Sequence, residues 1–227
     1  TSEGQLNLSA DGQFLTIGGY DAVLGQASVN STAGIPRVIA RINSVGTVAT
    51  SVLTSTTHAS GFRSVVTTDG SRYWTAGNGV GVTSILHQGN TTPTAPTTIS
   101  STITNLRTVS IFNNQLYAST GSGTTGIYKV GTGIPTTTGQ TSTINVPAGD
   151  IYAYQMVNRG GSDWNCYGVY ATSPGIYKWS SIDNGATWTA RGSVTTANVY
   201  GLTAANNGAS VDLYATSTVS TTSTIIK

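Results

Sequence analysis

The chain has 227 residues, 8% of them charged, and a formal net charge of +2. An average domain carries roughly 25% charged residues, so Ser, Thr and Gly fill the vacated positions and the surface should be rich in hydroxyl groups. The basic residues are scattered, which excludes the positive footprint of a nucleic-acid-binding protein and the polybasic patch of a membrane-surface protein. No apolar run approaches the ~20 residues of a membrane-spanning helix. We expect no nucleic-acid partner and no membrane insertion, and the oligomeric state stays open.

Five internal repeats organise the sequence. In each, a strand-like run leads into a turn rich in Asp, Asn and Gly. These segments are Gly4–Asp11, Phe62–Asp69, Leu106–Asn113, Ile151–Asn158 and Val199–Asn206. Their starts are 58, 44, 45 and 48 residues apart. A period near 45 residues with strand-like content is typical of four-stranded propeller blades.

The remaining strands of each repeat follow these turns. A second strand is predicted at residues 13–17, 71–75, 115–119, 168–172 and 212–216. Aromatic and β-branched residues in these runs fit a half-buried pleated surface. A third strand is predicted at 37–42, 126–130 and 175–179, and a fourth at 46–50, 97–100, 142–146 and 187–190. No helical periodicity appears anywhere in the chain.

The most specific motif is the eight-residue run Ser181–Trp188, which reads Ser-x-Asp-x-Gly-x-Thr-Trp. It resembles the Asp-box, a β-hairpin signature of sialidase-type and related β-propellers. The resemblance implies structural roles for Ser181, Asp183, Gly185, Thr187 and Trp188. The Asp would accept hydrogen bonds from turn N–H groups, the Gly would allow a left-handed backbone, and the Trp would pack beneath the hairpin. It also implies a position away from any active site.

Repeats and motif together predict an all-β protein, a β-propeller of four-stranded antiparallel blades with five repeats, the last one incomplete. One domain is expected over residues 1–227, with blades at about 4–57, 58–104, 105–149, 150–197 and 198–227. The first repeat is longer because of the loop Asp21–Pro36, which is either a functional loop or a neutral insertion. No fourth strand follows in the last repeat. The chain is then either a fragment of a larger propeller, which we prefer, or a five-bladed ring with a three-stranded last blade.

Two sets of side chains are candidates for ligand binding. The second position of each repeat holds Gln5, Arg63, Arg107, Tyr152 and Tyr200, which would line one level of a central channel if the register holds. Arg63 and Arg107 would then grip a carboxylate or sulfate. The alternative is that these positions are solvated or paired locally, because a slip of one residue reverses every face. Trp74 and Trp164 would offer flat faces to sugar rings, or else pack between blades.

Catalysis has little support in the residues. Glycoside hydrolysis needs two carboxylates at a defined separation, yet Glu3 is the only glutamate and most Asp residues lie in or beside turns. Cys166 is the only cysteine, so no disulfide forms within the chain, and a small buried hydrophobe is favoured over a catalytic thiol. Two histidines, His58 and His87, do not make a metal site. We expect no catalytic residues, no metal and no cofactor.

Several features favour an extracellular location. The chain begins at Thr1 without a Met, which we interpret as a processed or trimmed N-terminus. Thr-rich linkers fit O-glycosylation, and Asn30 and Asn90 are sequons in predicted loops. The sequence therefore predicts an extracellular, non-enzymatic module, either for binding or as a surface structure, with a glycan or protein ligand. The alternative is part of an Asp-box glycan-processing hydrolase.

Overall fold

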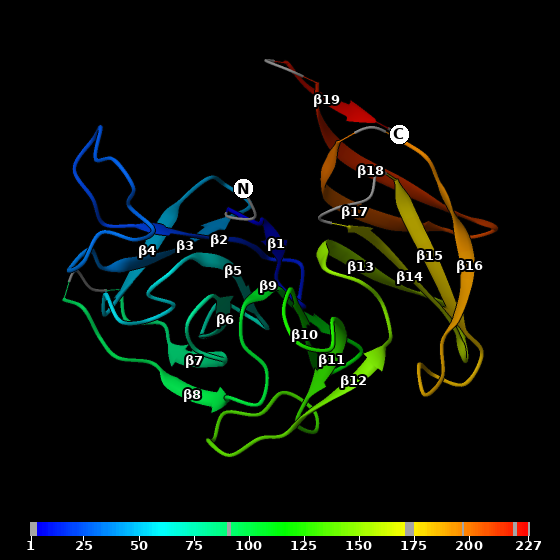
Figure 1. Ribbon diagram of the computed structural model, residues 1–227, viewed down its shortest axis with the longest axis horizontal. Coiled ribbons are helices and arrows are strands. Elements are labelled where there is room, and N and C mark those ends of the chain that lie inside the picture. The colour runs from blue at the N-terminus through cyan, green and yellow to red at the C-terminus, as the bar shows by residue number, and fades with distance from the viewer. Residues whose placement is uncertain (1–3, 90–91, 171–174, 197, 220–221, 227) are drawn as a thin grey trace. The chain divides into compact units, whose positions relative to one another are not determined.

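All the regular secondary structure among the residues that the structure describes consists of strands. Figure 1 shows the computed structural model, which describes residues 4–89, 92–170, 175–196, 198–219 and 222–226. Within these ranges no helix occurs that is long and apolar enough to cross a membrane. The strands form five sheets, and within each sheet every strand pairs with the next one along the chain.

The sheets follow the predicted repeats. The first contains β1 (Asn7–Leu8), β2 (Phe14–Tyr20), β3 (Arg37–Asn43) and β4 (Val48–Leu53). The second contains β5 (Phe62–Thr67), β6 (Arg72–Gly77), β7 (Val82–Leu86) and β8 (Thr97–Ser100). The third contains β9 (Leu106–Phe112), β10 (Gln115–Thr120), β11 (Gly126–Val130) and β12 (Ser142–Val146). The fourth contains β13 (Ile151–Gly160), β14 (Asp163–Tyr170), β15 (Ile176–Ser181) and β16 (Thr189–Val194), and the fifth β17 (Val199–Asn207), β18 (Ser210–Val219) and β19 (Thr222–Ile226).

Four antiparallel sheets thus have four strands and the fifth has three. An up-and-down meander of four strands is the blade of a β-propeller, so the predicted fold class is confirmed, including the shorter last repeat. The chain divides into two compact units. Unit 1 contains Thr1–Gly123 and Lys129–Thr143, and unit 2 contains Thr124–Tyr128 and Ile144–Lys227. That residues 1–227 form one domain stays a prediction.

The core of unit 1 lies where strand β5 packs between β2 and β9. Phe62 and Val65 of β5 are fully buried, together with Ile39 and Leu53 of the first sheet. Gly18 of β2 makes this approach possible, because a Cβ at that position would lie 2.7 Å from the Phe62 ring. The glycine therefore holds the first and second sheets at packing distance.

The core of unit 2 lies where β17 packs against β13 and β14. Ala153, Val169, Val199 and Ala215 are buried there, and Ile176 is partly buried against them. Small and β-branched side chains dominate this contact, which allows two twisted sheets to approach closely. One face of the fourth sheet is thereby anchored to the fifth sheet.

Two strands of the fourth sheet differ from their predicted bounds. The second strand was expected at 168–172 but β14 begins at Asp163, because β13 and β14 form a long hairpin with a tight turn after Gly160. Residues 171 and 172 lie outside the described residues. The fourth strand was expected at 187–190 but begins at Thr189, because Thr187 and Trp188 belong to the Asp-box turn.

Candidate functional site

The Asp-box forms the turn between β15 and β16, as its pattern implies. Asp183 Oδ1 accepts hydrogen bonds from the Ala186 and Thr187 N–H groups at 3.0 and 2.9 Å, and Ser181 Oγ donates to it at 2.6 Å. Thr187 Oγ1 donates to Oδ2 at 2.6 Å. Hydrogen bonds from the hydroxyls, with Ser181 contributing most and Thr187 next, hold the pKa of the Asp183 carboxyl well below its usual range.

The same hairpin explains where Trp164 and Trp188 lie. Gly185 has a φ of +73°, and a Cβ there would lie 2.6 Å from the Trp164 ring. Trp188 Nε1 donates to Asn145 Oδ1 at 3.0 Å, and Asn145 Nδ2 donates to the Gly185 carbonyl at 2.9 Å. The Asp-box turn is thus hydrogen-bonded to β12 of the third sheet and packed on β14, which gives it a structural role.

The two tryptophans proposed as sugar platforms are buried. Trp74 is 3% exposed and its Nε1 donates to the Pro135 carbonyl at 2.7 Å, whereas Trp164 is 4% exposed beneath the Asp-box. Neither presents a ring face to solvent, and the packing alternative accounts for both positions. Cys166 is also buried, and burial raises the pKa of its thiol.

The five candidate channel positions fall into two groups. Gln5 and Arg63 are neighbours in unit 1, where the Gln5 N–H donates to the Arg63 carbonyl at 3.2 Å. Arg63 is 9% exposed, and its Nη1 donates at 2.8 Å to both Asn105 Oδ1 and the Leu106 carbonyl. Arg107, also in unit 1, is partly buried. Local pairing therefore accounts for Arg63, while a ligand role for Arg107 stays a prediction.

The tyrosines of the alignment lie together in unit 2. The Tyr152 and Tyr200 rings are 6.0 Å apart between centroids. That they line one level of a central channel and bind a ligand there stays a prediction. Of the two predicted glycosylation sites, Asn30 is partly buried and its carbonyl accepts a hydrogen bond from Arg37 Nη2 at 3.5 Å. Asn90 lies outside the described residues.

The histidines are hydrogen-bonded within unit 1. His58 is buried with Nε2 2.9 Å from Thr75 Oγ1, and burial, followed by the charges of Arg37 and Arg63, lowers its pKa to about 3. His87 Nδ1 lies 2.8 Å from the Tyr73 hydroxyl and 3.1 Å from Ser51 Oγ. Within the described ranges, no three His, Cys, Asp or Glu side chains gather into a group that would hold a metal.

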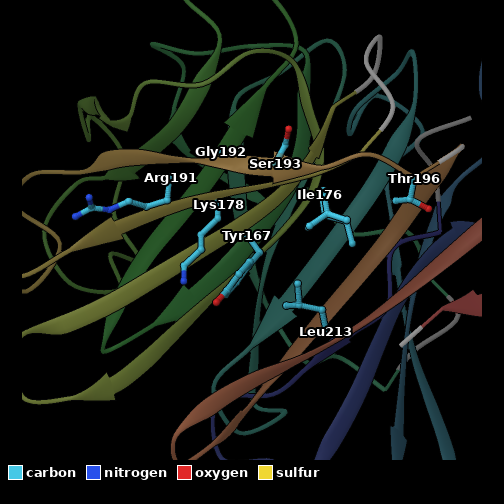
Figure 2. Close-up of a pocket in the computed structure, with 9 residues that line it drawn as sticks. Tyr167, Ile176, Lys178, Arg191, Gly192, Ser193, Thr196 and Leu213 are labelled. Carbon is cyan, nitrogen blue, oxygen red and sulfur yellow. The ribbon is translucent and has the colours of Figure 1, made fainter.

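A pocket of about 340 Å³ opens on the fourth sheet of unit 2, and sequence reasoning missed it. Its lining residues are Tyr167, Ile176, Lys178, Arg191, Gly192, Ser193, Val194, Thr196 and Leu213. Figure 2 shows Tyr167, Lys178 and Arg191 extending toward one side, while Ile176, Thr196 and Leu213 lie on the other. The pocket therefore has a polar, cationic end and an apolar end.

The register of the sheet explains the cationic end. Tyr167 pairs with Lys178 and Lys178 pairs with Gly192 across β14, β15 and β16, so the three positions form one row. The next pair is Trp179 with Ala190, which leaves Arg191 as the extra residue of a β-bulge. A bulge redirects the side chain at the irregularity, and Arg191 consequently lines the same pocket as Lys178. Single-sequence periodicity assumes strict alternation and cannot reveal such a bulge.

Comparison with known proteins adds a likeness of fold only. No protein family matches the sequence, and no curated protein is significantly similar to it. Among solved structures, YCF48 from Cyanidioschyzon merolae is similar with a TM-score of 0.47 and 11% sequence identity. The similarity covers 78% of this chain and 60% of that chain, so this chain spans three fifths of the length of the structure it matches.

Proposed function

We propose that this chain is a non-enzymatic binding module of the Asp-box β-propeller superfamily, and that the pocket on its fourth sheet is the ligand site. The observation that carries the proposal is the pocket itself, with two cationic side chains at one end and aliphatic side chains at the other. Its volume of about 340 Å³ lies within the range of small-molecule sites. The Asp-box geometry at the adjacent end of the same sheet supports the superfamily assignment.

A binding role is favoured over hydrolysis by the chemistry of the lining. A glycoside hydrolase needs two carboxyl groups beside the scissile bond, and none of the nine lining residues is acidic. Tyr167 is 6% exposed, and burial is the main cause that raises the pKa of its phenol. It is therefore suited to donating a hydrogen bond and poorly suited to attack as a phenolate.

The extracellular location is part of the same proposal. A surface poor in charge and rich in hydroxyl groups suits a secreted or cell-surface protein, and Asn30 lies in the loop between β2 and β3 as a sequon. The test is the intact mass of the protein from its native source, before and after deglycosylation. A glycosylated protein loses mass on deglycosylation. A mass of 23.3 kDa that does not change would contradict a glycosylated surface protein.

The binding proposal is tested by blocking the pocket. Val194 lines it from the edge strand β16 and is 69% exposed, so Val194→Trp should fill the pocket without disturbing the core. Val48→Trp is the matched control, because Val48 is 56% exposed on β4, the corresponding edge strand of the first sheet. Ligands found by screening a glycan array and a fragment library should bind the control and fail to bind Val194→Trp. Equal binding to both variants would overturn the proposal.

A further inference from the structure

We infer that the ligand of this pocket is a small organic anion with an apolar body, whose carboxylate or sulfate lies between Lys178 and Arg191. The inference rests on the proposed function, because it assumes that the pocket binds a ligand. It goes further by naming the class of ligand, which follows from three features of the lining: the unopposed charge, the direction of its donors and the apolar end.

The first feature is charge. Two of the nine lining residues are cationic and none is acidic. Across the part of the chain that the structure describes, no carboxylate forms an ion pair with Lys178 or Arg191. Beyond the lining, the charges that act on Tyr167 are those of Arg159, which lowers the pKa of the phenol, and of Asp163, which raises it. An anion entering the pocket therefore meets an excess of positive charge that the protein itself does not neutralise.

The second feature is the direction of the donors. Arg191 Nε donates to Ser180 Oγ at 2.6 Å, which fixes the base of the guanidinium. Its two terminal nitrogens have no partner among the described residues and form the planar fork that matches a carboxylate or sulfate. Lys178 Nζ lies 5.7 Å from the centre of the Tyr167 ring, and this contact holds the ammonium beside the phenol. A phenol, an ammonium and a guanidinium, from Tyr167, Lys178 and Arg191, thus line the same end of the pocket.

The third feature is the apolar end. Ile176 pairs with Val194 across β15 and β16, and Leu213 of β18 lines the same pocket. Val194 is largely exposed, so a ligand with an apolar body would remove that side chain from water. A neutral sugar would leave both cations without a counter-charge, and a bare inorganic anion would leave the apolar end empty. A molecule that carries an anionic group on an apolar body satisfies both ends.

The experiment compares two ligands that differ only in charge. Phenylbutyrate and phenylbutyramide have the same apolar body, and binding is measured by ligand-observed NMR and calorimetry. A charge-assisted hydrogen bond is about twice as strong as a neutral one. The acid should therefore bind about tenfold or more tightly than the amide, a ratio that corresponds to about 1.4 kcal/mol. An alkyl sulfate of similar length should bind like the acid.

Variants locate the effect. Arg191→Gln and Lys178→Gln should each weaken binding of the acid and leave binding of the amide nearly unchanged. Arg72→Gln is the control, because Arg72 lies on β6 of unit 1 and outside the pocket. The double variant Lys178→Gln with Arg191→Gln should bind acid and amide equally.

The outcomes separate the two proposals. If acid and amide bind equally and Val194→Trp blocks both, the pocket is a binding site but the anionic class is wrong. If neither compound binds, the class is again wrong, and the screen against Val194→Trp then decides the proposed function alone. If the acid binds and Val194→Trp has no effect, both proposals fall.

Discussion

At the scale of the residue, Gly185 is the most constrained position of the Asp-box. It combines a φ of +73° with a Trp164 ring that lies 2.6 Å from where a Cβ would stand. Gly185→Ala should therefore destabilise the protein through two effects. A non-glycine residue in this backbone region costs ~1–2 kcal/mol, and forcing a methyl group into a packed contact costs ~1–3 kcal/mol more.

A second glycine of unit 2 separates these effects. Gly208 has a φ of +65° in the turn between β17 and β18, with nothing within 4 Å of its added Cβ. Gly208→Ala should cost only the backbone term. Urea denaturation of both variants measures the difference, which we expect at ~1–3 kcal/mol for the contact with Trp164. Equal losses for the two variants would show that the Trp164 ring moves aside.

The Asp183 carboxylate gives a prediction that depends on pH. Its pKa is lowered in the folded protein by the hydroxyls of Ser181 and Thr187. A depressed carboxyl pKa contributes stability that is present above the unfolded value of ~3.9 and is lost as pH falls through the folded value. Asp183→Asn should therefore melt at a lower temperature than the parent protein at neutral pH. The difference in melting temperature between the two proteins should become smaller below about pH 4. A difference that stays constant with pH would argue against a role of the Asp183 charge.

Residue roles were predictable where a local motif specifies them. Ser181, Asp183 and Gly185 make the hydrogen bonds within the turn that the Asp-box pattern implies, because these bonds join residues at most four positions apart. Trp74 was not predictable in the same way, since its partner is the Pro135 carbonyl, 61 residues away. The cationic end of the pocket depends on the bulge at Arg191, which no pattern of residue types marks.

At the scale of the element, hairpins with a side-chain-stabilised turn were predicted best. Ser9 Oγ donates a hydrogen bond to Asp11 Oδ1 at 2.6 Å and accepts one from the Phe14 N–H of β2 at 2.9 Å. Asp69 accepts two hydrogen bonds from Ser71. These turns fix where one strand ends and the next begins. The start of β14 was missed because the predicted strand began only at Gly168, whereas Asn165 and Cys166 are already buried in the sheet.

The loop before β5 is held by buried groups that no periodic pattern reveals. Arg37 of β3 is buried and donates from Nε to the Thr57 carbonyl at 3.1 Å and from Nη2 to the Ala59 carbonyl at 2.9 Å. His58 lies between those two residues with a φ of +47°. Its burial beside two arginines lowers its pKa to about 3. The loop is thus built to hold a neutral imidazole next to a fixed positive charge.

This arrangement predicts acid sensitivity of unit 1. A histidine pKa of about 3 in the folded state lies below the ordinary 6.5, so the unfolded state binds the proton more tightly. The contribution of His58 to the free energy of unfolding is fully present above about pH 6.5. It decreases as the pH falls toward 3, by at most ~1.4 kcal/mol per pH unit.

His58→Asn isolates this contribution, because Asn tolerates a positive φ and does not titrate. The variant should have a flatter dependence of unfolding free energy on pH between about 6.5 and 4.5, where most carboxyl groups stay ionised. His87→Asn is the comparison. The expected change in its pH dependence is smaller, because His87 is partly exposed whereas His58 is fully buried. Parallel curves for His58→Asn and the parent protein would refute the assignment.

At the scale of the whole molecule, periodicity predicted five sheets and the missing strand of the last one. Each repeat forms one sheet, so a spacing of about 45 residues between repeats indicates the number of sheets directly. The pocket lies outside what a period can show. It requires the face of one sheet, a bulge on its edge strand and a side chain from the next sheet, and these are separated by up to 46 residues, from Tyr167 to Leu213.

The scarcity of charge leads to a prediction for the whole molecule. With 10 basic and 8 acidic residues among 227, surface electrostatics contribute little to folding. The melting temperature should therefore change little between about 0.01 and 1 M NaCl, although the Debye length falls from ~30 to ~3 Å. Binding of an organic anion between Lys178 and Arg191 should weaken over the same range, because salt screens that attraction. Thermal melts and calorimetry at matched salt concentrations measure both. A melting temperature that changes with salt concentration would show that the few charges contribute to the stability of the fold. An affinity for the anion that does not change with salt concentration would assign recognition to the apolar end of the pocket.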